Sequence, residues 1–118
     1  MANDLPLRVQ LRRTKGFNLQ RESLALNSLP AVKVDRSTRW GNIYRVGMFK
    51  NFTAADAVEA FEARLKENMH DDARWIMEHI EELRNKNIAC WCKLPKPGEP
   101  DLCHGTILLG IANPRALK

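Results

Sequence analysis

The chain has 118 residues, of which 44% are hydrophobic and 28% charged, and its formal net charge is +5. These values are typical of one folded domain, and no apolar run approaches the roughly 20 residues of a membrane span. The positive charge favours anionic partners such as nucleotides or nucleic acid. Because residues 1–13 contain no secretory signal, we expect a cytosolic protein without a disulfide framework.

The first third of the chain has the pattern of strands. Residues 7–13 alternate apolar and polar side chains, which predicts a half-buried strand. Residues 14–30 are mostly polar and predict a loop that holds at most one short helical turn. Residues 31–36 alternate again and predict a second strand, which is followed by a turn at Gly41 and Asn42.

The rest of the chain is mainly helical. Thr53, with Asp56 three residues later, has the pattern of a capping box and predicts the start of a helix. An acidic pair that begins at Asp71 predicts the start of a second helix. Residues 87–92 form a short apolar run and predict a strand, and residues 103–113 predict a last helix.

The order strand, strand, helix, helix, strand, helix predicts an α/β domain. We expect a small, three-layer-like domain with a short, mainly parallel sheet of three to four strands, flanked by three helices. One domain should cover residues 1–118, with about six residues at the N-terminus and five at the C-terminus flexible.

All three cysteines lie in one short stretch of the chain, beside a histidine. Cys90 and Cys92 are two residues apart on a predicted strand, so their side chains share one face. Cys103 and His104 open the predicted last helix, where the helix dipole stabilises a thiolate. One interpretation is a zinc site formed by Cys90, Cys92, Cys103 and His104, since three thiols and one imidazole are a known ligand set.

Three other interpretations of the cysteines stay open. Cys103 could be a reactive, catalytic thiolate whose proton His104 adjusts. Cys92 and Cys103 could form a disulfide that acts as a redox switch. The cysteines could also be small core residues without chemistry, since free cysteine is among the most buried residue types.

The segment after the second predicted strand has the composition of an anion-binding loop, because it combines two arginines, two hydroxyls and a tight turn. We expect it to meet the cysteine segment at the carboxyl edge of the sheet, with Trp40 as an apolar wall. The N-terminus of the last helix would help to hold the anion. The predicted ligand-binding residues are Arg12, Arg36, Arg39, Trp40, Gly41, Asn42, Gly105 and Thr106.

Four sequence segments together, LRRTKGF, VDRSTRWGN, CWC and CHG, resemble the domain of unknown function 4326 family. The resemblance spans roughly residues 7–112. The residues that carry it are Arg12, Arg13, Lys15, Gly16, Arg36, Trp40, Gly41, Asn42, Cys90, Trp91, Cys92, Cys103, His104 and Gly105. It implies a phage or prophage setting, in the cytoplasm of a bacterial host cell, and it supplies no activity.

We therefore expect a phosphorylated or nucleotide-like ligand to bind at a site lined by cysteine, histidine, arginine and tryptophan. The alternative is an accessory protein that binds a host protein or nucleic acid without catalysis, with zinc or packed cysteines in a structural role. The sequence leaves open whether the protein is an enzyme, which cofactor besides zinc it would use, and its oligomeric state.

Overall fold

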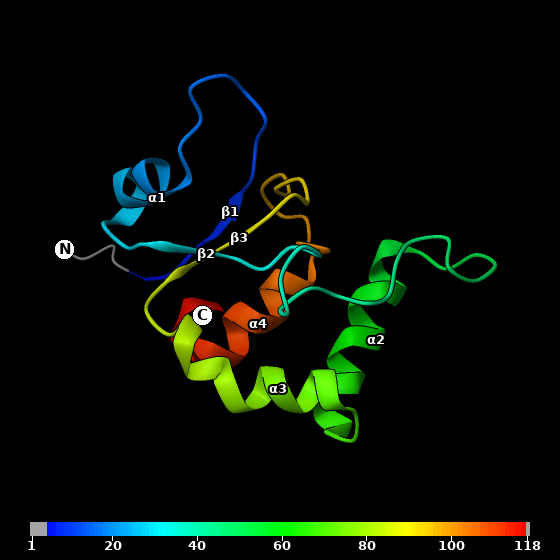
Figure 1. Ribbon diagram of the computed structural model, residues 1–118. Coiled ribbons are helices and arrows are strands. Elements are labelled where there is room, and N and C mark those ends of the chain that lie inside the picture. Colours follow the sequence, from blue (N-terminus) through cyan, green and yellow to red (C-terminus); the bar gives the residue numbers. More distant parts are fainter. Residues whose placement is uncertain (1–4, 118) are drawn as a thin grey trace.

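The computed structural model describes residues 5–117, and at its centre is a small sheet of three parallel strands in the order β1-β3-β2 (Figure 1). The strands are β1 (Arg8–Gln10), β2 (Ala31–Lys33) and β3 (Asn87–Cys90). Arg8 and Val32 both pair with Ile88, so β3 is the central strand although it comes last in the chain. The predicted parallel sheet is confirmed, with strands shorter than the alternating segments.

Four α-helices accompany the sheet in the part of the chain that the structure describes. They are α1 (Leu19–Asn27), α2 (Ala54–Glu67), α3 (Asp71–His79) and α4 (His104–Ala112), with two short 3-10 helices, η1 (Ile80–Leu83) and η2 (Pro114–Leu117). The capping box at α2 is present, because the Asp56 amide donates to Thr53 Oγ1 and the Thr53 amide donates to the Asp56 carboxylate. Between residues 5 and 117, no helix has the length and apolar character needed to cross a membrane.

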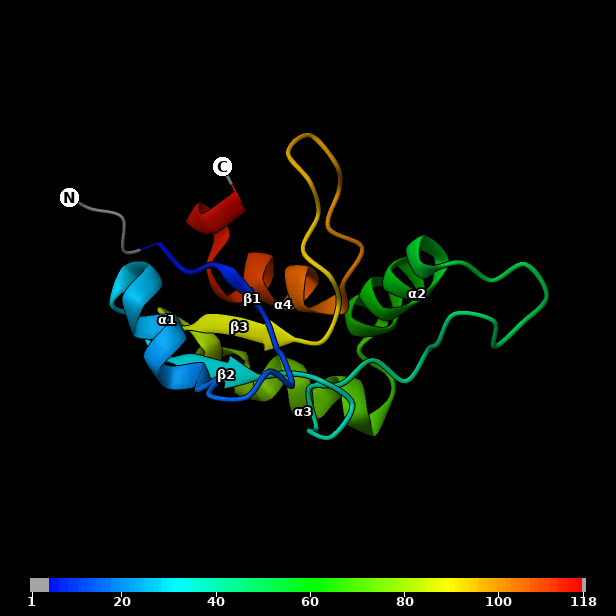
Figure 2. The same cartoon turned by 90° about the horizontal axis from the view of Figure 1, so that it is seen from above.

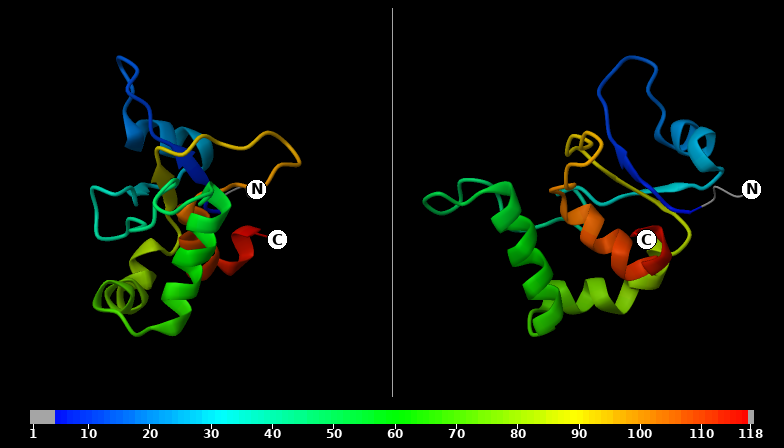
Figure 3. Two further views of the ribbon diagram at one scale, coloured as in Figure 1. Left: turned by 90° about the vertical axis from the view of Figure 1, so that its right-hand side faces the viewer. Right: turned by 180° about the vertical axis from the view of Figure 1, so that it is seen from behind.

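Neighbouring residues of β3 face opposite sides of the sheet, as the pleat requires. Ile88 and Cys90 belong to the larger core, together with side chains of α2, α3 and α4. Ala89 packs with Val9 in a smaller core that includes Leu19 of α1. Figures 1 and 3 show α1 on one side of the sheet and the other three helices on the opposite side, which confirms the three-layer-like α/β arrangement.

Helix α1 is a correction to the sequence analysis, which predicted three helices and a loop over residues 14–30. The residues that α1 buries are Ser23 and Asn27, so no apolar stripe marks it in the sequence. Both bond to Asn87, whose Nδ2 donates to Ser23 Oγ at 2.7 Å and to Asn27 Oδ1 at 2.8 Å. A buried polar network fixes the second half of α1 at the start of β3, while Leu19 at the first turn packs in the smaller core.

The chain ends were predicted to be flexible, and part of that prediction falls on residues 1–4 and 118, which lie outside the described residues. Pro6 is buried, and η2 packs against α4. At the other side of the molecule, residues 43–52 form a loop that projects from the body before α2 begins (Figure 2).

Candidate metal and ligand site

Three thiols come together beyond the carboxyl end of β3. The sulfur atoms of Cys90, Cys92 and Cys103 all lie within 4.8 Å of one another, and Cys90 Sγ is 3.8 Å from Cys92 Sγ. Sulfur atoms that bind one zinc ion tetrahedrally, each at about 2.3 Å, are about 3.8 Å apart. The Cys90–Cys92 distance therefore matches that of a metal-thiolate site, and the Cys103 sulfur is close enough to act as a third ligand.

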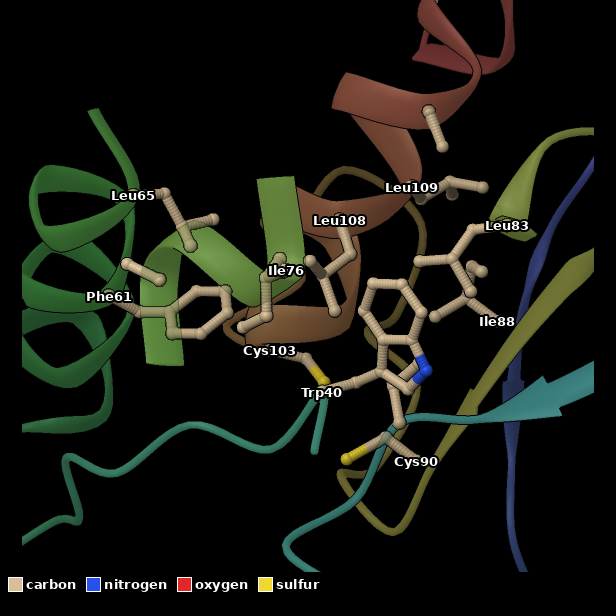
Figure 4. Packing of buried hydrophobic residues seen from close by; sticks show 13 residues of the cluster. Trp40, Phe61, Leu65, Ile76, Leu83, Ile88, Cys90, Cys103, Leu108 and Leu109 are labelled. Atoms are coloured by element: carbon tan, nitrogen blue, oxygen red, sulfur yellow. The ribbon is translucent and has the colours of Figure 1, made fainter. Parts of the chain in front are cut away.

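The backbone brings each thiol to the cluster for a local reason. Cys90 is the last residue of β3 and belongs to the larger core (Figure 4). Cys92 lies two residues further on the same side, as the sequence predicted. Cys103 is the N-cap of α4 and is 1% exposed, and its sulfur accepts a hydrogen bond from the Gly105 amide at 3.4 Å.

The three thiols share protons. Hydrogen bonds from the Cys103 and Cys92 thiols lower the pKa of Cys90, whereas hydrogen bonding to Cys90 and Cys92, together with burial, raises the pKa of Cys103. The three thiols therefore titrate as one coupled group, in which a thiolate on one sulfur is stabilised by its neighbours' S–H groups. A divalent metal ion would replace the shared protons and leave all three sulfurs as thiolates.

His104 lies beside the cysteine cluster but outside the one group of side chains, among residues 5–117, that could together hold a metal ion. Its Nε2 donates to the backbone carbonyl of Val34 at 2.6 Å, and its ring packs edge-on against Phe61. Burial lowers the pKa of His104, so the imidazole is neutral at pH 7. The structure therefore groups three of the four predicted zinc ligands and shows His104 linking α4 to the end of β2.

A buried arginine of β1 holds the loop that joins Cys92 to Cys103. Arg8 Nη2 donates to the carbonyls of Cys92 at 2.8 Å and Lys93 at 3.0 Å, while its Nε pairs with Asp101. Both ends of the cysteine loop are thereby fixed to the sheet. The Arg8 side chain is only 4% exposed, and its Nη1 has no hydrogen-bond partner within the described structure.

Arg8 also brings a positive charge to the thiols. Burial lowers the pKa of Arg8, but the hydrogen bond to Asp101 and the charges of Cys103, Asp101 and Cys92 outweigh it and raise the pKa. Alternation along the first strand groups Arg8 with the polar, outward side chains, so its burial was not predicted. Its register partner Ile88 faces the larger core, so strand pairing, which the sequence alone does not show, was the missing signal.

A hollow of about 430 Å³ opens beside the cysteine cluster, and we call it the cysteine pocket. Three segments line it: residues 35–46 after β2, the first turns of α2, and the cysteine segment including His104. The predicted meeting of the loop after β2 with the cysteine segment is therefore present. Pockets of this size are typical of small-ligand sites.

Arg36, Gly41 and Asn42 build the loop after β2. Arg36 donates from Nε to the Asn42 carbonyl at 3.1 Å and from Nη2 to the Tyr44 carbonyl at 3.0 Å. Asn42 is buried and donates to the carbonyl of Ala57 in α2 at 3.0 Å. A Cβ at Gly41 would lie 2.7 Å from the Arg36 Cα, so only glycine fits this close approach. Arg36 and Asn42 line the cysteine pocket, but Gly41 does not.

Other predicted ligand-binding residues lie elsewhere. Trp40 is 6% exposed and packs edge-on against Trp75 in the larger core, so it does not line the cysteine pocket. Arg39 extends over the Trp75 ring and faces a second hollow. Arg12 is exposed and lines neither hollow. The structure thus keeps these three side chains out of the cysteine pocket, although Trp40 shares the larger core with Cys90 and Cys103 (Figure 4).

The N-terminus of α4 is filled by groups of the protein itself. Gly105 is buried, and a Cβ there would lie 3.3 Å from Ile88 Cγ2 and 3.4 Å from the Cys103 sulfur. The Thr106 hydroxyl donates to the Asp101 carboxylate at 2.8 Å. Gly105 therefore allows close packing of α4 on β3, and Thr106 helps Arg8 to hold the cysteine loop.

Two residues that the sequence analysis did not select form one wall of the cysteine pocket. Asp35 accepts a hydrogen bond from Ser37 Oγ at 2.6 Å and another from Trp91 Nε1 at 2.8 Å. Burial raises the pKa of Asp35, but these hydrogen bonds outweigh it and lower the pKa, so the carboxylate is ionised at neutral pH. Arg13 covers the Trp91 ring at 4.6 Å. Only the fold could reveal this wall, because Asp35 and Trp91 are 56 residues apart in the sequence.

The comparisons with known proteins found one family. The model described as Domain of unknown function (DUF4326) matches residues 9–114. No curated protein and no solved structure matches the chain. Since the matched segment contains the cysteine cluster, the loop after β2 and nearly the whole sheet, the chain belongs to the family described as domain of unknown function (DUF4326).

Proposed function

We propose that this domain binds a phosphorylated, nucleotide-like ligand in the cysteine pocket, and that a zinc ion held by Cys90, Cys92 and Cys103 forms part of the pocket wall. The cluster spacing carries the proposal, because the Cys90 and Cys92 sulfurs lie at the separation of two thiolates on one zinc ion, with the Cys103 sulfur within 4.8 Å of both. Among residues 5–117 no fourth acidic, cysteine or histidine ligand joins the group. A three-ligand zinc keeps one position open for a ligand or water.

The position of the cluster supports an open site rather than a closed, structural one. All three cysteines line the cysteine pocket, so a metal among them would contact whatever enters it. Three thiolates around Zn²⁺ carry one net negative charge, and the buried guanidinium of Arg8 lies where it can balance that charge.

The other walls of the pocket suit a ligand with a flat, partly polar part. Trp91 is 40% exposed and lines the pocket, so the ring face opposite Arg13 offers a surface for a base to pack against. Asp35 offers a carboxylate acceptor, while Ala57 and Val58 of α2 add apolar area. We assign no reaction to the pocket, since ligand binding is what the geometry supports.

We further propose that the protein works in the cytoplasm of a bacterial host cell, in the phage or prophage setting that the family resemblance implied. Three free cysteines with neighbouring sulfur atoms stay reduced only in a reducing compartment, where disulfides are rare. The proposal predicts that protein recovered under reducing conditions carries metal rather than a Cys90–Cys92 or Cys92–Cys103 disulfide.

Metal analysis and cobalt spectroscopy test the proposal. We expect one zinc per chain in protein purified without added metal, and loss of zinc from Cys90→Ser, Cys92→Ser and Cys103→Ser alike. Cobalt in place of zinc should give intense thiolate-to-metal absorption. Adding a nucleoside monophosphate should then change the visible d–d bands, because the ligand occupies the open coordination position.

His104→Gln is the matched control for the cysteine variants. Because His104 lies outside the ligand group, His104→Gln should keep one zinc per chain provided that circular dichroism shows it folded. If a folded His104→Gln variant lost its zinc, His104 would be the fourth ligand and the site would be closed rather than open. Wild-type protein without stoichiometric metal, or cobalt bands that no nucleotide changes, would overturn the proposal.

A further inference from the structure

A second hollow, of about 630 Å³, adjoins the cysteine pocket, and we call it the arginine hollow. The two share Arg36 and Asn42 in their walls, so they meet along the loop after β2. Arg36, Arg39 and Arg45 contribute three guanidinium groups to the arginine hollow, while Asp71 and Asp72 at the start of α3 contribute two carboxylates.

The charges of the arginine hollow do not cancel. Asp72 is held by Arg64, whose Nη2 lies 3.0 Å from Asp72 Oδ1, and Asp71 pairs with Arg74. Within residues 5–117, no carboxylate forms an ion pair with any of the three arginines that line the hollow. Both acidic residues are thus satisfied by arginines of the helices, and the three arginines from the loop are left with uncompensated positive charge.

Two of these arginines are held in place before any ligand arrives. The Arg36 guanidinium is fixed by the carbonyls of Asn42 and Tyr44, which use two of its nitrogen atoms. The Arg39 guanidinium lies over the Trp75 ring, 4.2 Å from its centroid. A guanidinium that is already ordered loses less side-chain entropy when it binds a phosphate, and its planar donors match phosphate oxygens.

We propose that the arginine hollow binds the phosphate groups of the ligand whose other end enters the cysteine pocket. This inference rests on the proposed function and narrows its ligand to a nucleotide with two or more phosphate groups. Arg36 stands between the two hollows, Arg39 and Arg45 hold the outer phosphates, and the flat part of the ligand lies toward Trp91.

Calorimetric titration at low ionic strength, with pyrophosphate and then a nucleoside diphosphate as probes, tests the inference. The double variant Arg39→Gln/Arg45→Gln should bind pyrophosphate about 100-fold more weakly, since each charge-assisted contact contributes roughly tenfold. The matched control is Arg12→Gln/Lys15→Gln, which removes the same charge from exposed residues outside both hollows. It should bind within about threefold of wild type, as long-range attraction alone is a small effect.

The expected order of affinity is nucleoside diphosphate above pyrophosphate, because only the former fills both hollows. Equal affinities for the two probes would refute the idea that one ligand occupies both hollows. If both double variants lost the same pyrophosphate affinity, the binding would be non-specific charge attraction and not a site. Zinc content is measured on the same preparations. A protein that binds pyrophosphate but no zinc refutes the proposed function and keeps the arginine site, whereas a zinc protein that ignores pyrophosphate refutes the arginine site alone.

Discussion

The cysteine pocket and the arginine hollow share a wall but are held in different ways. The cysteine cluster is attached to the sheet and to α4, and its loop is fixed by the buried Arg8. The three arginines of the hollow lie exposed on one loop and depend on backbone carbonyls and one aromatic ring. Groups whose spacing decides the chemistry are thus fixed by the core, whereas groups that supply charge lie on a loop that can adjust to its ligand.

Removal of the proposed zinc should have the largest effect, and this effect should be confined to the cysteine pocket. We expect a strong chelator to lower the free energy of unfolding by about 3 kcal/mol or more, and the melting temperature by roughly 10 °C. Differential scanning calorimetry with and without chelator measures the change, and zinc should restore it. An unchanged melting temperature would mean that the cluster contributes no metal-linked stability.

Arg8→Met should come next, because it leaves Asp101 as a half-paired charge and frees both ends of the cysteine loop. We expect a loss of about 3 kcal/mol in urea unfolding and a metal affinity about 10- to 100-fold lower by chelator competition. Arg12→Met, on the exposed continuation of the same segment, is the control and should change neither. If Arg8→Met kept wild-type metal affinity, Arg8 would be a stability residue only.

Gly41→Ala should disturb both hollows at once, because they share the loop after β2. The new Cβ would lie 2.7 Å from the Arg36 Cα and 2.9 Å from the Asp35 carbonyl oxygen. Moving this backbone should cost about 2 kcal/mol of stability and weaken pyrophosphate binding while zinc stays bound. Wild-type stability in thermal unfolding would show instead that the loop relaxes around the methyl group.

The ion pair below the arginine hollow should give the smallest effect. The hydrogen bond and charge of Arg64 lower the pKa of Asp72, so this stabilisation is fully present above the ordinary aspartate pKa of about 3.9 and is lost as the pH falls through the lower value of the folded state. Its size should be below about 1 kcal/mol, as the Asp72 side chain is 40% exposed. Asp72→Asn and Arg64→Gln should each reduce the loss of unfolding free energy that occurs as the pH falls below about 3.9. If either variant left this acid dependence unchanged, it would come from other carboxylates.

The sequence was sufficient for the elements that follow apolar periodicity or helix-capping patterns. The three predicted strands, the capping box at Thr53 and the helix that begins after Cys103 are all present. Helix α1 was missed because it buries Ser23 and Asn27, although its N-cap Asn18, which accepts from the Arg21 amide at 3.0 Å, was a readable signal. Hydrophobic periodicity indicates a helix that buries apolar side chains, but it does not reveal a helix whose buried side chains are polar and hydrogen-bonded.

Only those parts of the candidate site that depend on residues close together in the sequence could be predicted. The cysteines were grouped by their spacing, and the loop after β2 was placed near them by the rule for parallel sheets. The buried or exposed state of a tryptophan depends on tertiary packing, so Trp40, predicted as a wall of the site, lies in the core, and Trp91, which was not selected as a site residue, lines the pocket. Arg8 and Asp101, 93 residues apart, meet only because β1 pairs with β3.

The placement of β3 between β1 and β2 has a consequence for how the chain folds. The outer strands β1 and β2 do not pair with each other, and each pairs only with β3. Its residue Ile88 follows Arg8 by 80 residues and Val32 by 56. On a translating ribosome, no sheet can form until that residue has emerged, and contacts of such long sequence separation make folding slow. The thiols at and after Cys90 emerge with the strand that completes the sheet, so the site proposed for zinc forms at the same time as the fold.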